Sequence, residues 1–473
     1  MTMAQTETLL LDVLATEKNA TEPVPVHISL CGTGALGASN RCASPNGVAA
    51  VAGQLTSNLH ELSGSKAAGD HSRLQSLAEE ITANINGATT GNEPARLNIA
   101  TAATELATAV RPPSDTIMSL FANMSIVSAI RVFQHWGVFD LIPSEPASSI
   151  TCGEIARRIG AEEGIVYRIS AMLTSSHILL TASPGELAHS PASLLLRSSE
   201  PMAAMFDLMY TNIVQVSDIL PGYFDSYGRK EPVGPSHVPS TVLTGEPELE
   251  YFKSISRNEE RMRNFTKAMK VTSGRVPVTG IYPLDRVLLS GENGRMAWVD
   301  VGGGAGHVLR RFREEYTVLR RSRCAVVDLK CVVEEGSVVA ARDEVMEEVQ
   351  WIKGDFMKEV PVKGARFYYL RHILRDYSDA VATLILRNVA QAMSHDSRVL
   401  ISEQINPAGG DETGRPMPLY AAFKDYSMLA IGGKERCLDQ FVRIGAAAGL
   451  KFEAVYHDSK GTRHGVVEFV LGS

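Results

Sequence analysis

Residues 298–307 constrain the fold of this chain more than any other stretch, because they join a strand, a glycine turn and a helix. Residues 296–301 form a short apolar run typical of a strand, four of the next five residues are glycine, and residues 308–316 are typical of an amphipathic helix. A strand that enters a glycine turn lets the backbone approach a ligand closely and directs the helix N-terminus at it. The segment therefore predicts a ligand site at a strand–turn–helix junction.

The spacing of the glycines indicates which ligand the turn binds. Asp300 is followed by Gly302, Gly304 and Gly306, an acid-x-Gly-x-Gly-x-Gly pattern found in S-adenosylmethionine (SAM) sites. The dinucleotide fingerprint has the different spacing Gly-x-Gly-x-x-Gly. A glycine-rich turn alone is equally compatible with a tight turn that binds nothing, so the interpretation depends on the residues that follow.

Acidic residues follow the next two predicted strands. Residues 324–328 form an apolar run that ends at Asp328, where a carboxylate can bind ribose hydroxyls. Asp355 and Phe356 come shortly after a third apolar run, residues 349–352. Because ligands of parallel sheets bind at the carboxyl ends of the strands, these side chains should lie beside the glycine turn. The combination predicts SAM as the cofactor.

Length and composition exclude several classes of protein. With 473 residues and 44% hydrophobic content, the chain can form two or three domains with cores. A formal charge of -7 and the absence of lysine and arginine runs argue against nucleic-acid binding. We expect no membrane span and no signal peptide, and hence a cytoplasmic protein. The six cysteines have no metal-ligand spacing, so no metal is expected.

Residues 1–95 differ from the rest of the chain. All aromatic residues lie at or after Phe121, and the first 95 residues are rich in Ala, Thr, Ser, Gly and Asn. Without aromatic side chains this low-complexity region can hardly build a full core, which favours a mobile N-terminal extension. Weakly amphipathic stretches at residues 6–14 and 74–85 leave open the alternative that helices here pack onto a partner subunit.

Residues 96–235 are expected to form a helical domain. Apolar residues at helical spacing predict a long helix over residues 114–142. Two helices, at 151–160 and 163–173, precede a hairpin around residues 184–185, an arrangement typical of a winged helix. The module is acidic to neutral and its second helix is short of base-reading side chains. We therefore expect it to contact protein, as the dimerisation domain of a homodimer, rather than DNA.

The C-terminal half has the pattern of an α/β domain. Helices rich in Met, Phe and Tyr, at 201–227 and 247–271, suit the lining of an apolar pocket. Apolar strands then alternate with helices, which predicts βαβ units around a mostly parallel sheet. The expected strands are 296–301, 324–328, 349–352, 366–370, 398–402 and 464–471. The fold class is therefore α/β: a Rossmann-like SAM-binding domain over 236–473, preceded by an α-helical winged-helix dimerisation domain.

These features together resemble the plant-type (caffeate-type) small-molecule O-methyltransferases and their fungal secondary-metabolism relatives. The resemblance covers roughly residues 110–473 and fails for the N-terminal extension. It implies that the segment from Asp300 to Gly306 is the SAM loop and that Asp328 is the ribose-binding acid. It also implies that Asp355 and Phe356 flank the adenine. Arg371 stands where the family often has a lysine near the methionine end of SAM.

The resemblance identifies Glu403 and Glu435 as the two glutamates that normally flank a catalytic histidine, but that histidine is missing. The family pattern is His-Asp-Trp-Ser/Pro-Asp, whereas this chain has Arg375 and Asp376 followed by Tyr-Ser-Asp. Arginine stays protonated and has no acceptor, so it cannot act as a general base. His372 is an alternative base, although its offset of three residues favours a packed or capping histidine.

Arginine offers instead a fixed cation with a fork of donors, which can bind a carbonyl or stabilise an oxyanion. Arg-Asp at this place resembles the SAM-dependent pericyclases of fungal natural-product pathways, the leporin-type enzymes, which use SAM for its charge without transferring the methyl group. Lys330, where the family usually has proline, would add a second cation near the cofactor; the alternative is a solvated lysine. In leporin-type enzymes a pocket histidine assists the arginine, and Thr211 is the candidate donor in the corresponding region.

The sequence therefore predicts a homodimeric SAM-binding enzyme that acts on a small-molecule natural product as a pericyclase. Arg375 and Asp376 would hold a substrate carbonyl or quinone-methide oxygen, while SAM and Lys330 add positive potential. One alternative is a conventional O-methyltransferase that positions an already acidic phenol or enol. Another is a catalytically silent partner subunit. The two retained glutamates favour methyl transfer, the loss of the base disfavours it, and the intact glycine loop argues against a silent subunit.

Overall fold

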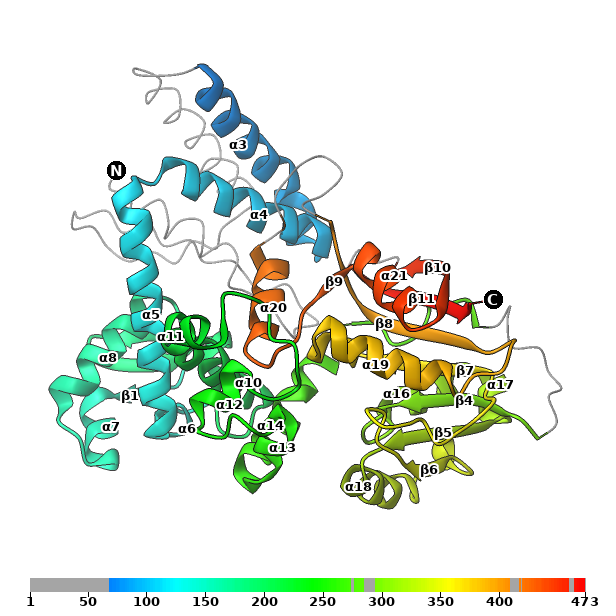
Figure 1. The fold of residues 1–473 in the computed structure, drawn as a ribbon. Helices are drawn as coiled ribbons and strands as arrows, with labels where there is room; N and C mark the ends of the chain where they lie inside the picture. Colours follow the sequence, from blue (N-terminus) through cyan, green and yellow to red (C-terminus); the bar gives the residue numbers. More distant parts are fainter. Residues whose placement is uncertain are drawn as a thin grey trace. The chain divides into compact units, whose positions relative to one another are not determined.

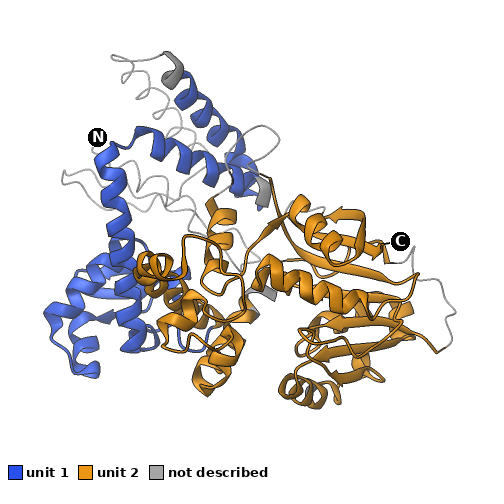
Figure 2. Cartoon of the chain, in the orientation of Figure 1, with its two compact units in different colours: residues 1–200 blue, residues 201–473 orange. Residues whose placement is uncertain are grey.

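The computed structural model describes residues 68–273, 276–284, 294–408, 417, 419–458 and 463–472. The chain divides into two compact units, residues 1–200 and 201–473 (Figure 2). The helices of residues 201–235, which the sequence assigned to the helical domain, fall in the second unit by this division. The reason is packing, since helix α10 (Pro201–Met209) lies along α14 (Glu259–Ser273) of that unit.

The first unit consists of helices and one small sheet. Its elements are α3 (Ala68–Thr89), α4 (Glu93–Val110), α5 (Pro113–His135), α6 (Val138–Leu141), β1 (Ile150–Thr151), α7 (Cys152–Ile159), α8 (Glu163–Ser175), β2 (Leu179–Ser183), β3 (Glu186–His189) and α9 (Pro191–Leu194) (Figure 1).

Helices α3 and α4 pack against each other through a small apolar cluster that includes Leu77, Ile81, Ile99 and Leu106. The described part of the predicted extension is therefore helical, and the expected boundary after residue 95 falls inside α4. The amphipathic stretch at 74–85 lies within α3, so it is helical, while its packing onto a partner subunit stays a prediction. The stretch at 6–14 lies outside the described residues.

The helix–turn–helix and the hairpin are present where the sequence placed them. Thr151 caps α7, because its Oγ1 accepts a hydrogen bond from the Glu154 N–H at 3.1 Å. The helix ends at Gly160, whose φ of 70° is the left-handed conformation that favours glycine at this position. Strands β2 and β3 pair antiparallel, and β1 extends the sheet in the order β1-β3-β2.

Helix α5 departs from two expectations. The long helix predicted over 114–142 is interrupted at Gly137, which has a φ of 68°, and α6 follows. By length and composition alone, α5 is the one helix in the described part of the chain that could cross a membrane, whereas no such stretch was expected. Core helices and signal sequences pass the same test, but only 17% of the apolar window of α5 is buried. This helix therefore exposes an apolar face.

The second unit begins with helices and continues as an α/β sheet domain. Its elements are α10, η2 (Tyr210–Gln215), α11 (Val216–Tyr227), α12 (Pro239–Leu243), α13 (Tyr251–Ser256), α14, β4 (Met296–Val301), α16 (His307–Glu315), α17 (Thr317–Arg320), β5 (Arg323–Asp328), α18 (Lys330–Ala340), η3 (Glu344–Met346), β6 (Gln350–Lys353), β7 (Phe367–Arg371), η4 (Leu374–Asp376), α19 (Asp379–Ala390), β8 (Arg398–Asn406), α20 (Leu419–Leu429), β9 (Arg436–Cys437), α21 (Leu438–Ala447), β10 (Leu450–His457) and β11 (His464–Leu471).

The large sheet has the strand order β10-β11-β8-β7-β4-β5-β6, and β9 pairs with the end of β8. Neighbouring strands from β8 to β6 are parallel, whereas β11 and β10 are antiparallel additions. All six predicted strands are present. The sequence missed β10, an edge strand in which Lys451 and Glu453 interrupt the apolar pattern, and the two-residue β9.

Apolar clusters cover both faces of the sheet, because successive side chains of a strand point to opposite faces. Val299 and Val301 of β4 belong to one cluster, which includes residues of α19 and α21. Trp298 of the same strand belongs to the other, which includes residues of α16 and α17. The predicted Rossmann-like arrangement of helices on both faces of a mostly parallel sheet is confirmed. Its carboxyl edge carries the glycine turn.

Candidate functional site

The glycine turn joins β4 to α16 and has the conformation that its spacing predicts. Gly302, Gly304 and Gly306 have φ values of 73°, 57° and 76°, in the left-handed region that other residues avoid. A Cβ on Gly302 would lie 2.5 Å from Cδ1 of Ile373, whereas one on Gly304 would meet open space. The turn thus packs tightly at its start and leaves its backbone accessible at Gly304.

Asp328, at the end of β5, reaches across to this turn. Its Oδ2 accepts a hydrogen bond from the Gly304 N–H at 2.8 Å, and its Oδ1 accepts one from the Leu329 N–H at 2.7 Å. A carboxylate offers about four acceptor positions, so each oxygen can accept a further hydrogen bond. Asp328 therefore fixes the turn and remains able to bind hydroxyl groups of a ligand.

Asp300 lies beneath the turn and is almost completely buried. Its Oδ2 has no hydrogen-bond partner among the described residues. Burial, with a further contribution from the Asp328 carboxylate, raises the pKa of Asp300 to about 7, although the charge of Arg371 opposes this rise. A buried acceptor without a partner is costly, which indicates that a ligand supplies the missing donor.

The other predicted cofactor residues lie at the same edge of the sheet. Phe356 approaches the turn, since a Cβ on Gly302 would meet its ring at 3.3 Å. Asp355 caps its own loop by accepting a hydrogen bond from the Met357 N–H at 3.0 Å. Arg371, at the end of β7, donates to Ser402 Oγ at 2.9 Å and to the carbonyl of Val276 at 3.2 Å. These positions suit a ligand that lies along the carboxyl edge.

The residues present fit SAM. Asp328 and the partnerless oxygen of Asp300 can accept hydrogen bonds from hydroxyl or ammonium groups, and Gly304 offers open backbone. Phe356 supplies an apolar surface next to the turn. The residues that would hold the cofactor are Asp300, Gly302, Gly304, Gly306, Asp328, Asp355, Phe356 and Arg371.

The turn that bears Arg375 follows β7 and is fixed from below by Glu403. This glutamate, inside β8, is 1% exposed. Its Oε1 accepts hydrogen bonds from the N–H of Leu374 at 2.7 Å and of Arg375 at 3.1 Å. Glu403 thus contacts the backbone of the turn rather than the Arg375 side chain. It is a positioning residue.

Arg436 holds the same turn from its carbonyl side, and sequence reasoning missed it. This fully buried arginine donates to the carbonyl of Leu374 at 2.6 Å and to the carbonyl of Tyr377 at 2.8 Å. Its Nε donates to Asp379 Oδ1 at 2.9 Å. The sequence pattern does not indicate that Arg436 is buried, because charged residues in a run are usually exposed to solvent. With Glu403 it makes the turn rigid.

The Arg375 side chain lies against Glu435 and Met428. Its Nη2 is 2.8 Å from Oε1 of Glu435 and 3.2 Å from Sδ of Met428, while its Nε is 4.0 Å from Oδ1 of Asp376. The contact with Glu435 is a charge contact without hydrogen-bond alignment. Among the described residues Nη1 of Arg375 has no partner. The guanidinium is therefore a nearly buried cation with donors left for a substrate.

Two titratable neighbours of Arg375 differ in their ability to take a proton. Burial raises the pKa of Asp376 to about 7, and the Glu435 carboxylate adds to the rise that Arg375 opposes. Burial and the charges of Arg371 and Arg375 lower the pKa of His372 well below its ordinary value. His372 has a left-handed φ of 53° and packs edge-on against His464. It matches the packed histidine, whereas Asp376 can exchange a proton near neutral pH.

Two further predicted residues are Lys330 and Thr211. The Lys330 side chain is 67% exposed, and its Nζ lies 3.6 Å from Glu334 of its own helix, so it matches the solvated alternative. Thr211 lies in η2, a turn of π-helix, but the buried polar side chain of that turn is Asn212. Its Nδ2 donates to the Tyr251 hydroxyl at 2.9 Å. A substrate-binding role for Thr211 stays a prediction.

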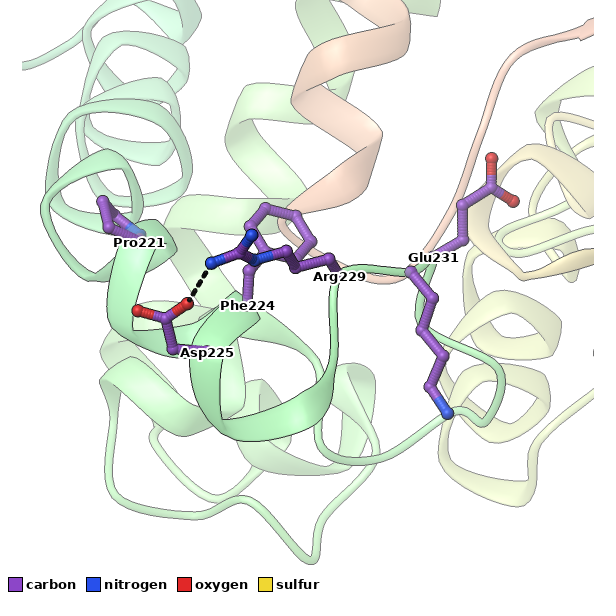
Figure 3. Close-up of a pocket in the computed structure, with 6 residues that line it drawn as sticks. Pro221, Phe224, Asp225, Arg229 and Glu231 are labelled. Carbon is purple, nitrogen blue, oxygen red and sulfur yellow. Dashed lines mark hydrogen bonds and ion pairs between the residues drawn. The ribbon is translucent and has the colours of Figure 1, made fainter.

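Two adjoining pockets lie beside α11, and the smaller one extends to the arginine-bearing turn. The larger, of about 770 Å³, is a wide depression open to solvent; residues from α11 and the loop that follows it line it, including Phe224 and Glu231, and it contains the Arg229–Asp225 ion pair (Figure 3). The other, of about 300 Å³, shares Phe224 and Glu231 and extends to Gly433. Gly433 packs on the turn so closely that a Cβ there would lie 2.2 Å from the Arg375 carbonyl.

Comparisons with known proteins agree with this geometry. A family model described as an O-methyltransferase domain matches residues 241–451. The methyltransferase pynC of Aspergillus niger is 31% identical over 76% of this chain and 98% of its own length. The methyltransferase cfoD of Aspergillus candidus is 29% identical over 84% and 98%.

Solved structures share the fold. OxaC in complex with sinefungin and meleagrin has a TM-score of 0.74 and 26% identity, covering 84% of this chain and 98% of OxaC. LepI in complex with SAM has a TM-score of 0.71 and 23% identity, covering 84% and 99%. At that identity the likeness to LepI shows the fold alone.

Proposed function

Because the chain belongs to the SAM-dependent O-methyltransferase family and its cofactor is SAM, we propose that it uses this fold in fungal-type secondary metabolism as a pericyclase. Its substrate is a small natural product with a carbonyl or quinone-methide oxygen. Arg375 stands in place of the family's general base and promotes a pericyclic or dehydrative cyclisation.

One observation carries this proposal: the guanidinium of Arg375 is a fixed, nearly buried cation with unpaired donors. Glu403 holds its backbone N–H, Arg436 holds the carbonyls on either side of it in the turn, and Glu435 holds its side chain. A donor that is already oriented stabilises a developing oxyanion without reorganisation, and its effect is largest where water is excluded. Arg375 can therefore polarise a substrate oxygen, whereas it cannot remove a proton.

Asp376 complements the arginine. With a pKa raised to about 7 by burial, it can accept or return a proton near neutral pH. A pericyclic rearrangement conserves all atoms and needs no such transfer. A dehydrative step breaks one C–H (or O–H) and one C–OH bond; Asp376 would take the proton from the first and pass it to the departing hydroxyl, which leaves as water. When bound, SAM supplies either a methyl group or a fixed positive charge close to these residues.

Conventional methyl transfer is the second candidate, and specific observations favour it. Both family glutamates are retained, Asp376 can serve as a base, and the relative at 31% identity is named a methyltransferase. An already acidic phenol or enol would need only correct positioning. The third alternative, a silent subunit, is disfavoured by the intact glycine turn and by the partnerless acceptor on Asp300.

The deciding experiment follows two products at once. Purified protein and SAM are incubated with pathway intermediates, and both S-adenosylhomocysteine release and isomer formation are measured. We expect isomer without S-adenosylhomocysteine, and a rate loss on the order of 10²–10³ in Arg375→Ala with unchanged SAM affinity. Release of one S-adenosylhomocysteine per product would establish methyl transfer and overturn the pericyclase proposal.

A further inference from the structure

Three buried polar side chains form a row of hydrogen bonds within the apolar helical region of the second unit. Ser240 Oγ donates to Asn212 Oδ1 at 3.3 Å, and Asn212 Nδ2 donates to the Tyr251 hydroxyl at 2.9 Å. All three residues are buried. Their neighbours are apolar, since Tyr251 belongs to a cluster formed by residues of α11, α13 and the end of α20. Buried polar groups in such surroundings need partners.

The donors and acceptors in this row of hydrogen bonds determine where the hydroxyl hydrogen of Tyr251 points. Because the Tyr251 oxygen accepts from Asn212, its own O–H must point away from Asn212. Among the described residues no acceptor for that hydrogen is present. Leaving a buried donor without an acceptor costs roughly 1–3 kcal/mol. An acceptor supplied by a ligand removes this cost.

The hydroxyl lies on the side of the arginine-bearing turn. Met428, whose Sδ contacts Arg375 Nη2 at 3.2 Å, packs against the same apolar cluster as Tyr251. The Ser240 N–H donates to the carbonyl of Ala430, two residues after Met428, at 2.8 Å. Burial raises the pKa of Tyr251 to about 12; the hydrogen bond from Asn212 and the charge of Arg261 oppose this rise, and the Asp376 carboxylate adds to it. The phenol is therefore a neutral donor near Asp376.

The turn of π-helix explains how Asn212 reaches this position. Residues 210–215 form η2 between α10 and α11, and such π-turns occur often at functional sites. The buried residue of this turn is Asn212, which is 8% exposed. Its hydrogen bond to the hydroxyl orients Tyr251, and the hydrogen bond from Ser240 fixes its own amide.

We propose that Tyr251 is a second substrate-binding donor, which joins Arg375 in holding one substrate oxygen that gains negative charge. Asn212 and Ser240 are positioning residues for Tyr251. The substrate class is an enolisable carbonyl compound or a phenol, bound more tightly as the oxyanion. This inference rests on the proposed function, in which Arg375 binds the reacting oxygen, and it adds the group that completes the oxyanion site.

The test measures oxyanion binding by the full chain loaded with S-adenosylhomocysteine. The probe is para-nitrophenolate, at a pH where it is ionised, and nitrobenzene is its neutral counterpart; calorimetry measures both affinities. We expect the wild type to prefer the anion. Tyr251→Phe should weaken phenolate binding about 10-fold, the effect of one hydrogen bond to a charged group, and leave nitrobenzene binding unchanged. Tyr223→Phe is the matched control, because Tyr223 is 5% exposed like Tyr251 and donates to the His237 carbonyl.

A second variant separates donation from packing. In Asn212→Asp the new carboxylate accepts the Tyr251 hydrogen, so phenolate binding should fall as in Tyr251→Phe although the phenol ring is intact. The double variant should be no weaker than Tyr251→Phe alone. Equal phenolate affinity in wild type and Tyr251→Phe, or no anion preference in the wild type, would overturn the inference. Absence of S-adenosylhomocysteine binding in the wild type would instead contradict the proposed function.

Discussion

Nη2 of Arg375 lies 2.8 Å from Oε1 of Glu435, a carboxylate with no exposed surface. This contact replaces the histidine–glutamate pair that the family resemblance implies at these positions. It holds a permanent cation at the place of the base. The stability of the fold and the charge of the site therefore depend on the same pair.

Glu435→Gln should destabilise the protein by roughly 2–3 kcal/mol. The substitution keeps the shape of the side chain but leaves the charge of Arg375 without its counterion, and breaking a fully buried pair costs about 3–5 kcal/mol. We place the effect below that range because the Arg375 side chain is 16% exposed. Urea unfolding measures it. Glu314→Gln, which removes a surface pair with Arg310, should change stability by less than about 1 kcal/mol, and equal effects of both substitutions would contradict this prediction.

As pH rises, the unfolding free energy of Asp376→Asn should increase relative to that of the wild type. Burial raises the folded-state pKa of Asp376 from 3.8 to about 7, so between these values the folded state binds more protons than the unfolded state. The contribution of Asp376 is thus present below the unfolded pKa and lost as pH rises toward 7. Since one pKa unit is worth about 1.4 kcal/mol, the difference between variant and wild type should shift by at least that amount.

For Asp396→Asn the stability difference from the wild type should change with pH in the opposite direction. The guanidinium of Arg295 holds the pKa of Asp396 well below its usual range. Its stabilising contribution is present above the unfolded pKa and lost only as pH falls through the folded one. Unfolding curves at several pH values measure both variants. The Asp376 prediction is contradicted if the difference in unfolding free energy between Asp376→Asn and the wild type stays constant from about pH 4 to about pH 7. That result would mean that Asp376 is ionised in the folded state over this whole range.

Gly302→Ala and Gly304→Ala should separate folding from cofactor binding. Both positions have positive φ, which costs an alanine about 1 kcal/mol. Only at residue 302 does a Cβ also collide, at 2.5 Å from Ile373. We expect Gly302→Ala to lose clearly more stability in urea unfolding. Gly304→Ala should keep most of its stability but bind S-adenosylhomocysteine less tightly in calorimetry, since its Cβ enters the open side of the turn. If Gly304→Ala lost more stability, and Gly302→Ala lost more affinity for S-adenosylhomocysteine, the cofactor could not be assigned to the open side of the turn at Gly304.

The cofactor half of this site could be predicted from the sequence because its signals are local. Gly302, Gly304 and Gly306 follow a strand directly, and Asp328 closes the next strand, so spacing alone places them at one edge of a parallel sheet. The structure adds what spacing cannot show: which carboxylate oxygen holds the Gly304 N–H, and that one oxygen of Asp300 lacks a partner.

The arginine-bearing half could be predicted only in part. The replacement of histidine by Arg375 is visible in the motif. The role of Arg436 is not, because only tertiary packing shows that this charge is fully buried against carbonyl groups. Asn212 and Tyr251 are 39 residues apart in the chain and meet through a turn of π-helix, which periodicity does not predict. Lys330 was assigned a role by its neighbourhood in sequence, but its helix directs it to solvent.

Asp328→Ala should weaken S-adenosylhomocysteine binding about 10- to 100-fold, the range expected when a hydrogen-bonding carboxylate is removed. The variant also loses the bond that orients Gly304. Lys330→Ala, two residues away and 67% exposed, should bind as the wild type does. Calorimetry on both variants checks the pair, and weakened binding by Lys330→Ala would restore the idea that this cation acts on the cofactor.

The exposed face of α5 leads to the last prediction, that the protein is a homodimer built through this helix. Its apolar side chains Ile117, Met118, Leu120, Phe121 and Met124 are 56–63% exposed. Exposed apolar patches of this kind mark interaction sites, and covering one large side chain contributes about 1.5–3 kcal/mol. Phe121→Glu should therefore raise the dimer dissociation constant at least about 10-fold. Val338→Glu, at an apolar residue 67% exposed on α18, should leave the dimer intact. Light scattering at micromolar concentration is the measurement. A monomeric wild type would contradict the prediction. If the wild type instead floats with lipid vesicles, the exposed face of α5 binds a membrane.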